Sequence, residues 1–520
     1  MQKIIYRSVL FAGFIMFSAM SSAVTFFDIW EYRIEGVKHL DQSVVQRAVE
    51  PFLGEARTID DIDKAAQAIQ TLYQKAGYPT TAISVPNQDI NRGVITLVVD
   101  ETVVRQVKIV GSKYFSLDNI RKQFPSLEEG KVLNVPALQT QARLANQVNR
   151  DLKIVPALKA SPQPGAIDVD LTVADELPFH GGIEVTNYHT ETTTPTRLSA
   201  DFRYGNLWQK NHEVSIQFQV TPENTDEVQV VAGSYLMPIN NLSGKLALYA
   251  VDSQSQLSVA VNDIEVIGNG RIYGLRWVQP IKQTPRAIHS FSIGGDYKDF
   301  DENLELPGDV TITTPIQYST FSAQYNLYHR GKKVTDTAST GFTFGSRLFN
   351  NDSSEFGIKR SQADSSFSLW RFNWKRAYQV LDNWEISHSI RGQITESPLV
   401  SNEQMSAGGV TSVRGYYESQ IQGDSGWIGT IEILPPSWEP KFNWIDGVSP
   451  YLFYDASRLR LNQPLTDQQS NFSIASFGAG FKTMFFDSVH LKVESGYPLK
   501  HEGSIEKGDI ATRASLRMDF

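Results

Sequence analysis

Hydrophobic and polar residues alternate through residues 178–520. Val214, Ile216 and Phe218 are separated by serine and glutamine, and the same pattern returns at residues 370–375. Successive side chains of a strand point to opposite faces, so each such segment predicts a strand with one apolar and one polar face. Counting these segments predicts about sixteen strands, with no convincing helix among them.

Alternation alone fits a soluble β-sandwich as well as a membrane barrel. Aromatic residues crowd the predicted strand ends, as they do in the interfacial girdles of membrane barrels. They are Tyr204, Trp208, Tyr235, Trp277, Tyr325, Tyr328, Trp384 and Trp427. These positions favour the barrel.

The last predicted strand indicates the same architecture. Leu516, Met518 and Phe520 share an apolar face, while two arginines and an aspartate share the other face. Charged residues fit a water-filled interior, and a sheet crosses lipid only when all of its edges are closed. We therefore expect residues 178–520 to form an all-β, closed antiparallel transmembrane barrel. The three apolar residues are expected to mark its closing strand and to act as its assembly signal.

Residues 30–177 follow a different pattern, in which helices alternate with strands. Ile34–Leu40 matches Ile109–Phe115 at a constant offset, and each copy predicts a strand that ends at glycine. Two helices and two further strands follow in each copy. We therefore expect two α+β repeats of the form βααββ, at residues 30–103 and 104–177, with the helices packed on a small sheet.

The first residues predict export. Lys3 and Arg7 precede a short apolar run, and small residues follow it up to Ala23. This pattern is typical of a signal peptide, here residues 1–23, rather than of a membrane anchor. The alternative is an amphipathic helix of the mature fold.

Composition narrows the classes of function. The chain has 520 residues, no cysteine and a formal net charge of −9. The acidic balance argues against a nucleic-acid partner. The sequence contains no hydrolase elbow, P-loop, zinc spacing or calcium loop, so we expect no enzyme activity, no cofactor and no metal site.

One glycine-rich segment stands apart from the strands. Residues 405–417 contain a single charge, on Arg414, among small and aromatic residues. Glycine permits backbone turns that a Cβ would obstruct. The segment is neither periodic enough for a helix nor alternating enough for a strand, so we expect a loop that delivers one guanidinium to a chosen place.

These features together resemble a known family. A signal peptide, two βααββ repeats and a barrel with a conspicuous tetrapeptide after its eleventh strand resemble the outer-membrane transporters of two-partner secretion. These are the haemolysin-activation and filamentous-haemagglutinin secretion proteins of the Omp85 superfamily, and the repeats resemble POTRA domains. Residues 206–209, before a strand, and 235–238, expected at a later turn, also look like this family. The tetrapeptide is Val413, Arg414, Gly415 and Tyr416.

The resemblance implies a gate inside the barrel. The loop of residues 397–424 folds back into the lumen, and Arg414 at its tip pairs with Asp455 on the wall, beside Phe453. The family's Phe-x-Asp-x-Gly motif is matched here except that Ser457 replaces the glycine, which puts local geometry in doubt rather than the pair. One charge-assisted bond can fix the register of a long loop. The alternative is an ordinary solvated loop charge.

Each POTRA sheet is expected to have a free edge, which can accept an extended peptide as an added strand. We hypothesise that such an edge captures an unfolded substrate. The alternative is that these edges contact only each other or the barrel. The candidates are Ala82, Ile83 and Val85 in the first repeat, and Lys153, Ile154 and Val155 in the second.

Many members of this family carry an N-terminal helix that plugs the barrel. Only Val24 to Trp30 separate the expected cleavage site from the first POTRA strand. Seven extended residues reach at most about 25 Å and leave nothing to form the helix. We therefore expect no plug, and we expect the inward-folded loop to be the principal barrier.

The resemblance implies a transporter of the outer membrane of a Gram-negative bacterium, with its POTRA domains in the periplasm. It binds a large partner protein while that partner is unfolded and secretes it through the barrel (type V, two-partner secretion). Its other expected partners are outer-membrane lipid and the barrel-assembly machinery. The alternative is an assembly or insertase role in the same superfamily, whose members typically carry three or more POTRA repeats. A passive porin needs no POTRA pair, and a surface adhesin needs longer loops than we expect here.

Overall fold

The computed structural model describes residues 25–239, 244–254, 259–261, 264–266, 269–284, 286–301, 303–306, 310–347, 351–381, 383–440, 442 and 444–520. The expected signal peptide, residues 1–23, lies outside them. Within these ranges, no helix combines the length and the apolar character that crossing a membrane requires. Two compact units are present, one of residues 112–119, 144–153 and 174–520, and the other of the remaining residues up to 173.

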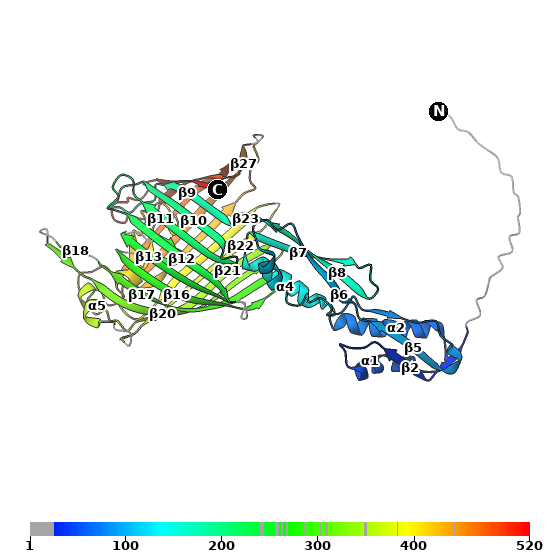
Figure 1. Ribbon diagram of the computed structural model, residues 1–520. Helices are drawn as coiled ribbons and strands as arrows, with labels where there is room; N and C mark the ends of the chain where they lie inside the picture. Colours follow the sequence, from blue (N-terminus) through cyan, green and yellow to red (C-terminus); the bar gives the residue numbers. More distant parts are fainter. Residues whose placement is uncertain are drawn as a thin grey trace, which may run out of the picture. The chain divides into compact units, whose positions relative to one another are not determined.

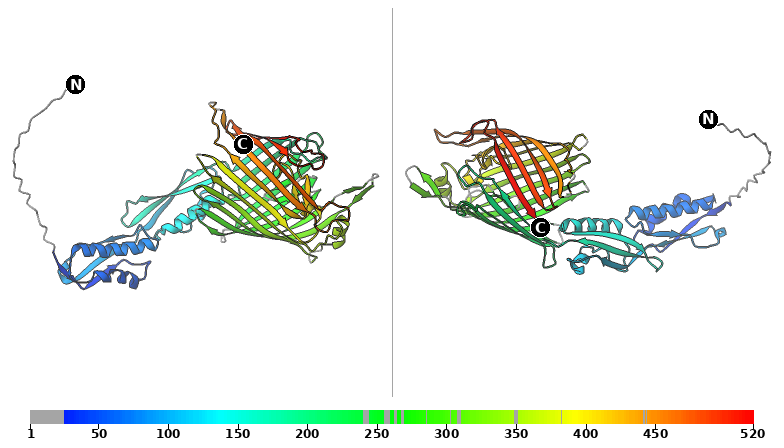
Figure 2. Two further views of the ribbon diagram at one scale, coloured as in Figure 1. Left: turned by 180° about the vertical axis from the view of Figure 1, so that it is seen from behind. Right: turned by 90° about the horizontal axis from the view of Figure 1, so that it is seen from above.

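Sixteen antiparallel strands close into a barrel, which confirms the predicted fold (Figure 1). Each strand pairs with its neighbour in the barrel order, and β30 pairs with β9 to complete the circle (Figure 2). The strands are β9 (Phe179–Thr186), β10 (Arg197–Leu207), β11 (His212–Val220), β12 (Gln229–Ile239), β13 (Gly244–Gln254), β16 (Gly270–Gln283), β17 (Ala287–Phe300), β20 (Ile316–Arg330), β21 (Val334–Gly345), β22 (Ser368–Gln379), β23 (Glu385–Ile394), β26 (Ser425–Leu434), β27 (Ile445–Arg460), β28 (Asn471–Phe485), β29 (Val489–Pro498) and β30 (Ala511–Asp519).

The barrel wall has an apolar outer face and a polar inner face. On β27, Leu452 and Tyr454 are 54% and 47% exposed, whereas Phe453 and Asp455 between and beside them are buried. Since neighbours on a strand point to opposite faces, Leu452 faces outward and Asp455 faces the interior.

The two ends of the barrel differ in their connections. At one end the turns are short, such as residues 208–211 between β10 and β11. At the other end several connections carry their own structure, and in outer-membrane barrels the longer connections are extracellular. These are β14 (Val259–Val261) with β15 (Ile264–Val266), β18 (Asn303–Leu306) with β19 (Val310–Thr313), α5 (Ser353–Lys359), a 3-10 turn (Ser401–Glu403), and β24 (Met405–Ala407) with β25 (Ile421–Gly423).

Four local expectations were wrong. The extracellular connections are not all short, and the barrel region contains a helix, α5, because Asp352 caps its first turn and Phe356 packs into a buried aromatic cluster. Alternation along a strand gives no signal for such a turn of helix. Residues 235–238 lie inside β12 rather than in a turn, since Pro238 sits near the end of the strand opposite Lys245, where a proline is tolerated. The segment 405–417 also begins with the short strand β24.

The two repeats before the barrel have the same sheet. In the first, β2 (Glu31–Glu35) pairs in parallel with β5 (Val94–Asp100), which pairs antiparallel with β4 (Ala82–Ser84). In the second, β6 (Val103–Val110) pairs in parallel with β8 (Ala166–Asp175), and β7 (Leu152–Ala160) lies on the far side of β8. The other elements are β1 (Phe27–Ile29), β3 (Gly54–Arg57), α1 (Gln42–Val49), α2 (Ile59–Lys75), α3 (Leu117–Lys122), α4 (Val135–Val148) and 3-10 turns at Glu50–Phe52 and Ile90–Arg92.

The helical stripe predicted in the first repeat is its core. Ala65, Ile69 and Tyr73 of α2 have no exposed surface and pack on the sheet. Thr58 and Asp61 form a capping box at the start of α2, and Gly77 follows its end at a φ of +97°, which favours glycine. Local signals and burial therefore agree on where this helix begins and ends.

The glycines that end the first strand of each repeat are required for the same structural reason. Gly36 and Gly111 have φ of +86° and +97°. A Cβ on Gly36 would lie 2.3 Å from the carbonyl oxygen of Val99, and one on Gly111 would lie 2.4 Å from that of Val173. The backbones approach too closely for any other residue, so the repeat in sequence marks a repeat in structure.

Candidate functional site

The connection between β23 and β26, which we call loop 6, folds into the barrel. Its tip buries Val413 and Tyr416 completely against Ile428, Leu459 and Ile474 of the barrel strands. The Tyr416 hydroxyl donates to the carbonyl oxygen of Lys500 at 2.8 Å. The tip is therefore a packed part of the interior and not a solvated loop.

Glycine makes this close packing possible. Gly415 has a φ of +95° and lies against Gly496 of β29. A Cβ on Gly496 would fall 2.6 Å from the backbone nitrogen of Gly415. The tip thus touches the wall backbone to backbone, and a side chain at either glycine would push it away.

Arg414 and Asp455 form a bidentate pair. Nε of Arg414 donates to Oδ2 of Asp455 at 2.7 Å, and Nη2 donates to Oδ1 at 2.8 Å. The backbone N–H of Arg414 also donates to Oδ2 at 3.1 Å. The arginine side chain is 6% exposed and the aspartate 0%. Ser457, which stands where the family's motif has glycine, does not prevent the pair from forming.

Two more carboxylates of the wall face the same guanidinium. Nη1 of Arg414 donates to Glu432 of β26 at 2.7 Å and lies 3.5 Å from Glu494 of β29. The central carbon of the guanidinium, Cζ, also lies over the Phe453 ring, 3.6 Å from its centre. Lys492 lies 2.9 Å from Glu494 and adds a second positive charge. The tip is therefore the positive centre of a largely buried acidic pocket.

The electrostatics of the tip favour the charged state. Burial alone would lower the pKa of Arg414, but the hydrogen bonds and charge of Asp455 and the charge of Glu432 outweigh it and raise that pKa above its ordinary value. The arginine is therefore permanently charged, and its removal leaves the fully buried Asp455 without a cation.

Sequence reasoning missed a second anchor of loop 6. Glu403, at the start of the loop, is fully buried. Its Oε1 accepts from Lys298 of β17 at 2.5 Å and from the Tyr318 hydroxyl of β20 at 2.8 Å, and Arg371 of β22 lies 3.6 Å from its Oε2. This limb is thus fixed to strands β17, β20 and β22, while the tip is fixed to β26, β27 and β29.

A third anchor holds the base of the loop. Asp424 has no exposed surface and pairs with Arg360, which follows α5. The same carboxylate accepts from the backbone of Asn462 at 2.6 Å and from Gln404 Nε2 at 3.0 Å. The available signal was two acidic residues flanking the glycine-rich segment, but the sequence does not show which basic residues they meet.

Five of the six candidate POTRA residues lie on edge strands, and Val85 directly follows the end of β4. β4 forms one edge of the first sheet and β7 one edge of the second. Val85 and Val155 are 42% and 54% exposed, and Ala82 and Lys153 are also exposed. Ile83 packs partly on the core, and Ile154 is buried. Ile154 can therefore offer a peptide only its backbone.

The closing strand presents its apolar residues outward. Leu516 and Met518 are 49% and 53% exposed. Phe520 exchanges two backbone hydrogen bonds of 3.0 Å with Gly181 at the start of β9. Its ring lies 6.3 Å from Phe179 and 6.1 Å from Phe202. The chain end therefore lies at the seam where the barrel closes.

The turn at residues 208–211 meets the part of the second repeat that belongs to the barrel unit. The side-chain oxygen of Gln209 accepts from the backbone of Ser116 at 2.9 Å. Asp151 accepts from Arg203 of β10 at 2.9 Å and lies 2.9 Å from His180. Within the described ranges, no group of acidic, histidine or cysteine residues could hold a metal ion.

Two family models match the chain. POTRA domain, ShlB-type, covers residues 27–102, and haemolysin secretion/activation protein ShlB/FhaC/HecB covers residues 165–483. POTRA domains followed by a sixteen-stranded barrel place the chain in the class of outer-membrane transporters of the Omp85 superfamily. The chain belongs to the ShlB/FhaC/HecB family of haemolysin secretion and activation proteins. The domain boundaries that we expect at residues 103 and 177 stay predictions.

The curated relatives that the chain matches are named as transporters. The outer membrane transporter CdiB of Escherichia coli strain 536 is 22% identical over 76% of this chain, and the match spans 66% of that protein. The heme/hemopexin transporter protein HuxB of Haemophilus influenzae strain 86-028NP is 20% identical over 88% of this chain and 80% of its own length. These names describe transporters and not enzymes.

Solved structures share the fold. CdiB from Escherichia coli superposes with a TM-score of 0.71, at 19% identity, over 97% of this chain and 92% of that one. BamA from Haemophilus ducreyi lacking POTRA domains 1–3 has a TM-score of 0.55, at 13% identity, over 96% and 100%. As a member of this family, the protein is an outer-membrane barrel whose POTRA domains lie in the periplasm.

Proposed function

We propose that this protein is the transporter of a two-partner secretion pair. Its POTRA domains bind a large partner protein while the partner is unfolded in the periplasm, and the barrel then passes that partner across the outer membrane. Relatives whose names designate them as transporters support this proposal. The barrel-assembly machinery is the expected route of insertion, with Leu516, Met518 and Phe520 as its signal.

The observation that carries the proposal is the bidentate bond of Arg414 to Asp455 inside the barrel. A channel that must pass a polypeptide, yet not leak, needs a barrier that can move aside as one piece. Loop 6 fits this role because its tip is anchored by side-chain bonds and tight contacts and not by a continuous sheet. We propose that passage of the partner requires the tip to leave the acidic pocket.

Substrate capture is proposed for the free edges of β4 and β7. An unfolded chain can add to such an edge through backbone hydrogen bonds, which do not depend on its sequence. The exposed side chains of Val85 and Val155 add an apolar contact on each edge. Folding of the partner outside the cell is the proposed source of free energy.

The test compares secretion by the wild type, Arg414→Ala and a strain without the gene. The proposal predicts that the deletion abolishes release of one specific large protein, and that Arg414→Ala inserts normally but secretes little of it. A general loss of outer-membrane proteins on deletion would instead support the insertase alternative. Photo-crosslinking from residues 82, 85 and 155 tests capture, and labelling restricted to helix positions would refute the edge mechanism.

A further inference from the structure

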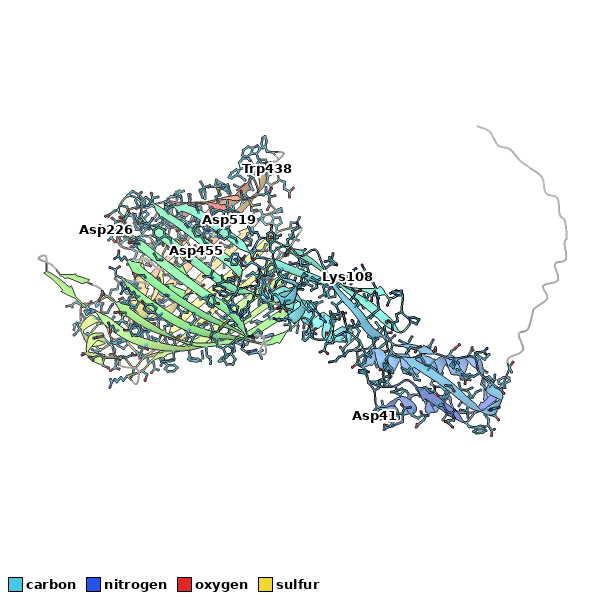
Figure 3. All side chains as sticks on the ribbon, viewed as in Figure 1. Asp41, Lys108, Asp226, Trp438, Asp455 and Asp519 are labelled. Atoms are coloured by element: carbon cyan, nitrogen blue, oxygen red, sulfur yellow. The ribbon has the colours of Figure 1, made fainter. Side chains whose placement is uncertain are left out.

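The turn between β26 and β27 continues beyond the sheet as a hairpin. The backbone N–H of Trp438 donates to the Val448 carbonyl oxygen at 2.9 Å, and that of Val448 donates to the Trp438 carbonyl oxygen at 2.7 Å. Figure 3 shows Trp438 on the part of the chain that projects from the barrel at this hairpin. This end is the one with short turns, which faces the periplasm.

This hairpin and the neighbouring turn between β28 and β29 expose a group of large aromatic side chains. Trp438, Phe442, Trp444 and Phe486 are 66%, 57%, 46% and 69% exposed. Trp444 stacks on Phe486 at 6.1 Å and on Phe485 at 5.9 Å, and it lies 5.8 Å from Phe442. We call these five residues the aromatic tip. Exposed apolar groups of this kind mark a surface that contacts lipid or protein.

The aromatic tip continues the lipid-facing wall. Trp438 lies opposite Val448, and Val448 is on the same face of β27 as the outward Leu452 and Tyr454. Phe485 is on the same face of β28 as Phe477, which is 49% exposed. A surface that runs without a break from the bilayer-facing wall points to lipid as its occupant.

The turn between β22 and β23, at the same end of the barrel, extends this apolar surface. Val380, Leu381 and Trp384, between β22 and β23, are 42%, 77% and 40% exposed. Only β26 separates β23 from β27 in the barrel order. By contrast, Arg330 and Lys332 are exposed around the turn between β20 and β21. One side of the periplasmic rim is therefore apolar and an adjacent side is basic.

We propose that the aromatic tip lies in the headgroup layer of the periplasmic leaflet, where it anchors the β26–β27 hairpin to the membrane surface. Tryptophan prefers this layer because its ring is apolar while its N–H needs a polar partner. Three carboxylates set the depth. Glu439, Asp446 and Asp487 each lie within two residues of an aromatic residue of the tip in the chain and need water, so the hairpin stops short of the hydrocarbon core.

The natural sequence offers a clean test, because it contains no cysteine. The single variants Trp438→Cys and Phe442→Cys of the full-length protein are labelled with a small fluorophore. Each is then reconstituted in phosphatidylethanolamine–phosphatidylglycerol vesicles. Nitroxide lipids quench at headgroup or mid-chain depth, and iodide quenches from water. Leu452→Cys, on the lipid-facing wall, is the membrane control, and Lys64→Cys, exposed on α2, is the aqueous control.

The proposal predicts that headgroup nitroxide quenches residues 438 and 442 most strongly, whereas mid-chain nitroxide is most effective at residue 452. Iodide quenching at 438 and 442 should be at least about threefold weaker than at residue 64, because the headgroup layer shields the probe. Heat-modifiable migration confirms that each variant is folded. Iodide quenching equal to that of residue 64, without lipid quenching, would overturn the proposal. Shielding that appears only when a protein partner is added would also overturn it.

Discussion

The tip of loop 6 and the free edges of the POTRA sheets solve opposite problems. Arg414 has a fixed set of partners, and only 6% of its side chain is exposed. The backbone of Arg414 lies so close to Gly496 that a Cβ on this glycine would not fit. The edges of β4 and β7 instead present backbone groups and exposed valines. A barrier needs one defined closed state, whereas capture of an unfolded chain needs a contact that tolerates many sequences.

This difference has an energetic consequence. Losing one partner of a buried, hydrogen-bonded ion pair leaves a charge without compensation, while losing one side chain on an edge leaves the backbone contact intact. Substitutions at the tip should therefore have large effects on transport, and substitutions at the edges should have small, cumulative ones.

The largest effect is expected for Arg414→Ala. The fully buried Asp455 would then lack its cation, and losing one partner of a buried pair costs about 3–5 kcal/mol. We expect the tip of loop 6 to lose its fixed position in the lumen. Secretion per inserted barrel should then fall close to background, because transport requires a loop that opens for the partner and also returns to one defined closed position. Immunoblotting of the culture supernatant and of the outer membrane measures both quantities.

The matched control for this variant is Arg347→Ala. Arg347 pairs with Asp364, but its side chain is 62% exposed, so its loss should cost only about 0–1 kcal/mol. Equal loss of secretion in the two variants would show that burial of the ion pair is not what matters.

A smaller effect is expected at the base of the loop. Asp424→Asn keeps the shape of the side chain but removes the charge that meets Arg360, which costs about 1–3 kcal/mol. We expect more frequent channel opening in planar bilayers and partial secretion. Glu396→Gln, in an exposed position of the same loop, is the control and should behave as the wild type.

At the POTRA edges, Val85→Asp and Val155→Asp should each weaken substrate binding by about fivefold, because each removes roughly 1 kcal/mol of apolar contact. Pull-down of the unfolded partner with the purified periplasmic repeats measures this change. Val44→Asp on α1, where the valine is 42% exposed but not on an edge, should leave binding unchanged. A loss at Val44 equal to that at Val85 would point to a helix surface as the capture site.

The last predicted effect is a dependence of the gate on pH. Burial raises the pKa of Glu418, next to the tip, to about 7, and the negative charge of Glu494 adds to this rise. The hydrogen bond from the backbone N–H of Val410 and the positive charges of Arg513 and Arg391 oppose the rise without cancelling it. The closed loop therefore binds a proton that the open loop, with an ordinary carboxyl, releases. Proton binding by Glu418 therefore stabilises the closed loop fully below pH 4.5, and this contribution to the free energy of closure is lost as the pH rises through 7.

Planar-bilayer recordings check this sign. Open probability should rise between pH 5.5 and pH 8 in the wild type and should stay level in Glu418→Gln, which remains neutral. A wild-type channel that opens more readily at the acidic end would contradict the assignment.

The sequence predicted the regular parts of this molecule well. Alternation sufficed for the barrel because every strand repeats one rule, and Gly36 and Gly111 marked the repeats because each meets a carbonyl oxygen. The helix α5 was missed because its stability comes from Phe356 packing among distant aromatic residues, which leaves no periodic trace in seven residues.

The site was predictable only in part. The pair of Arg414 and Asp455 followed from the family resemblance, but Glu432 and Glu494 did not, because they lie on strands separated by β27 and β28. Their meeting at one guanidinium depends on the curvature of the closed barrel. Glu403 likewise finds Lys298 across 105 residues of chain, and no local pattern encodes that contact.

The central claim is that loop 6, held by Arg414, closes the lumen. The most direct test is conductance of the purified full-length protein in planar bilayers, compared between wild type, Arg414→Ala, Asp455→Ala and the double variant. We predict small, rare openings for the wild type, large and frequent openings for each single variant, and no further increase for the double variant, because the two residues act as one unit. A wild-type conductance as large as that of Arg414→Ala would contradict the account.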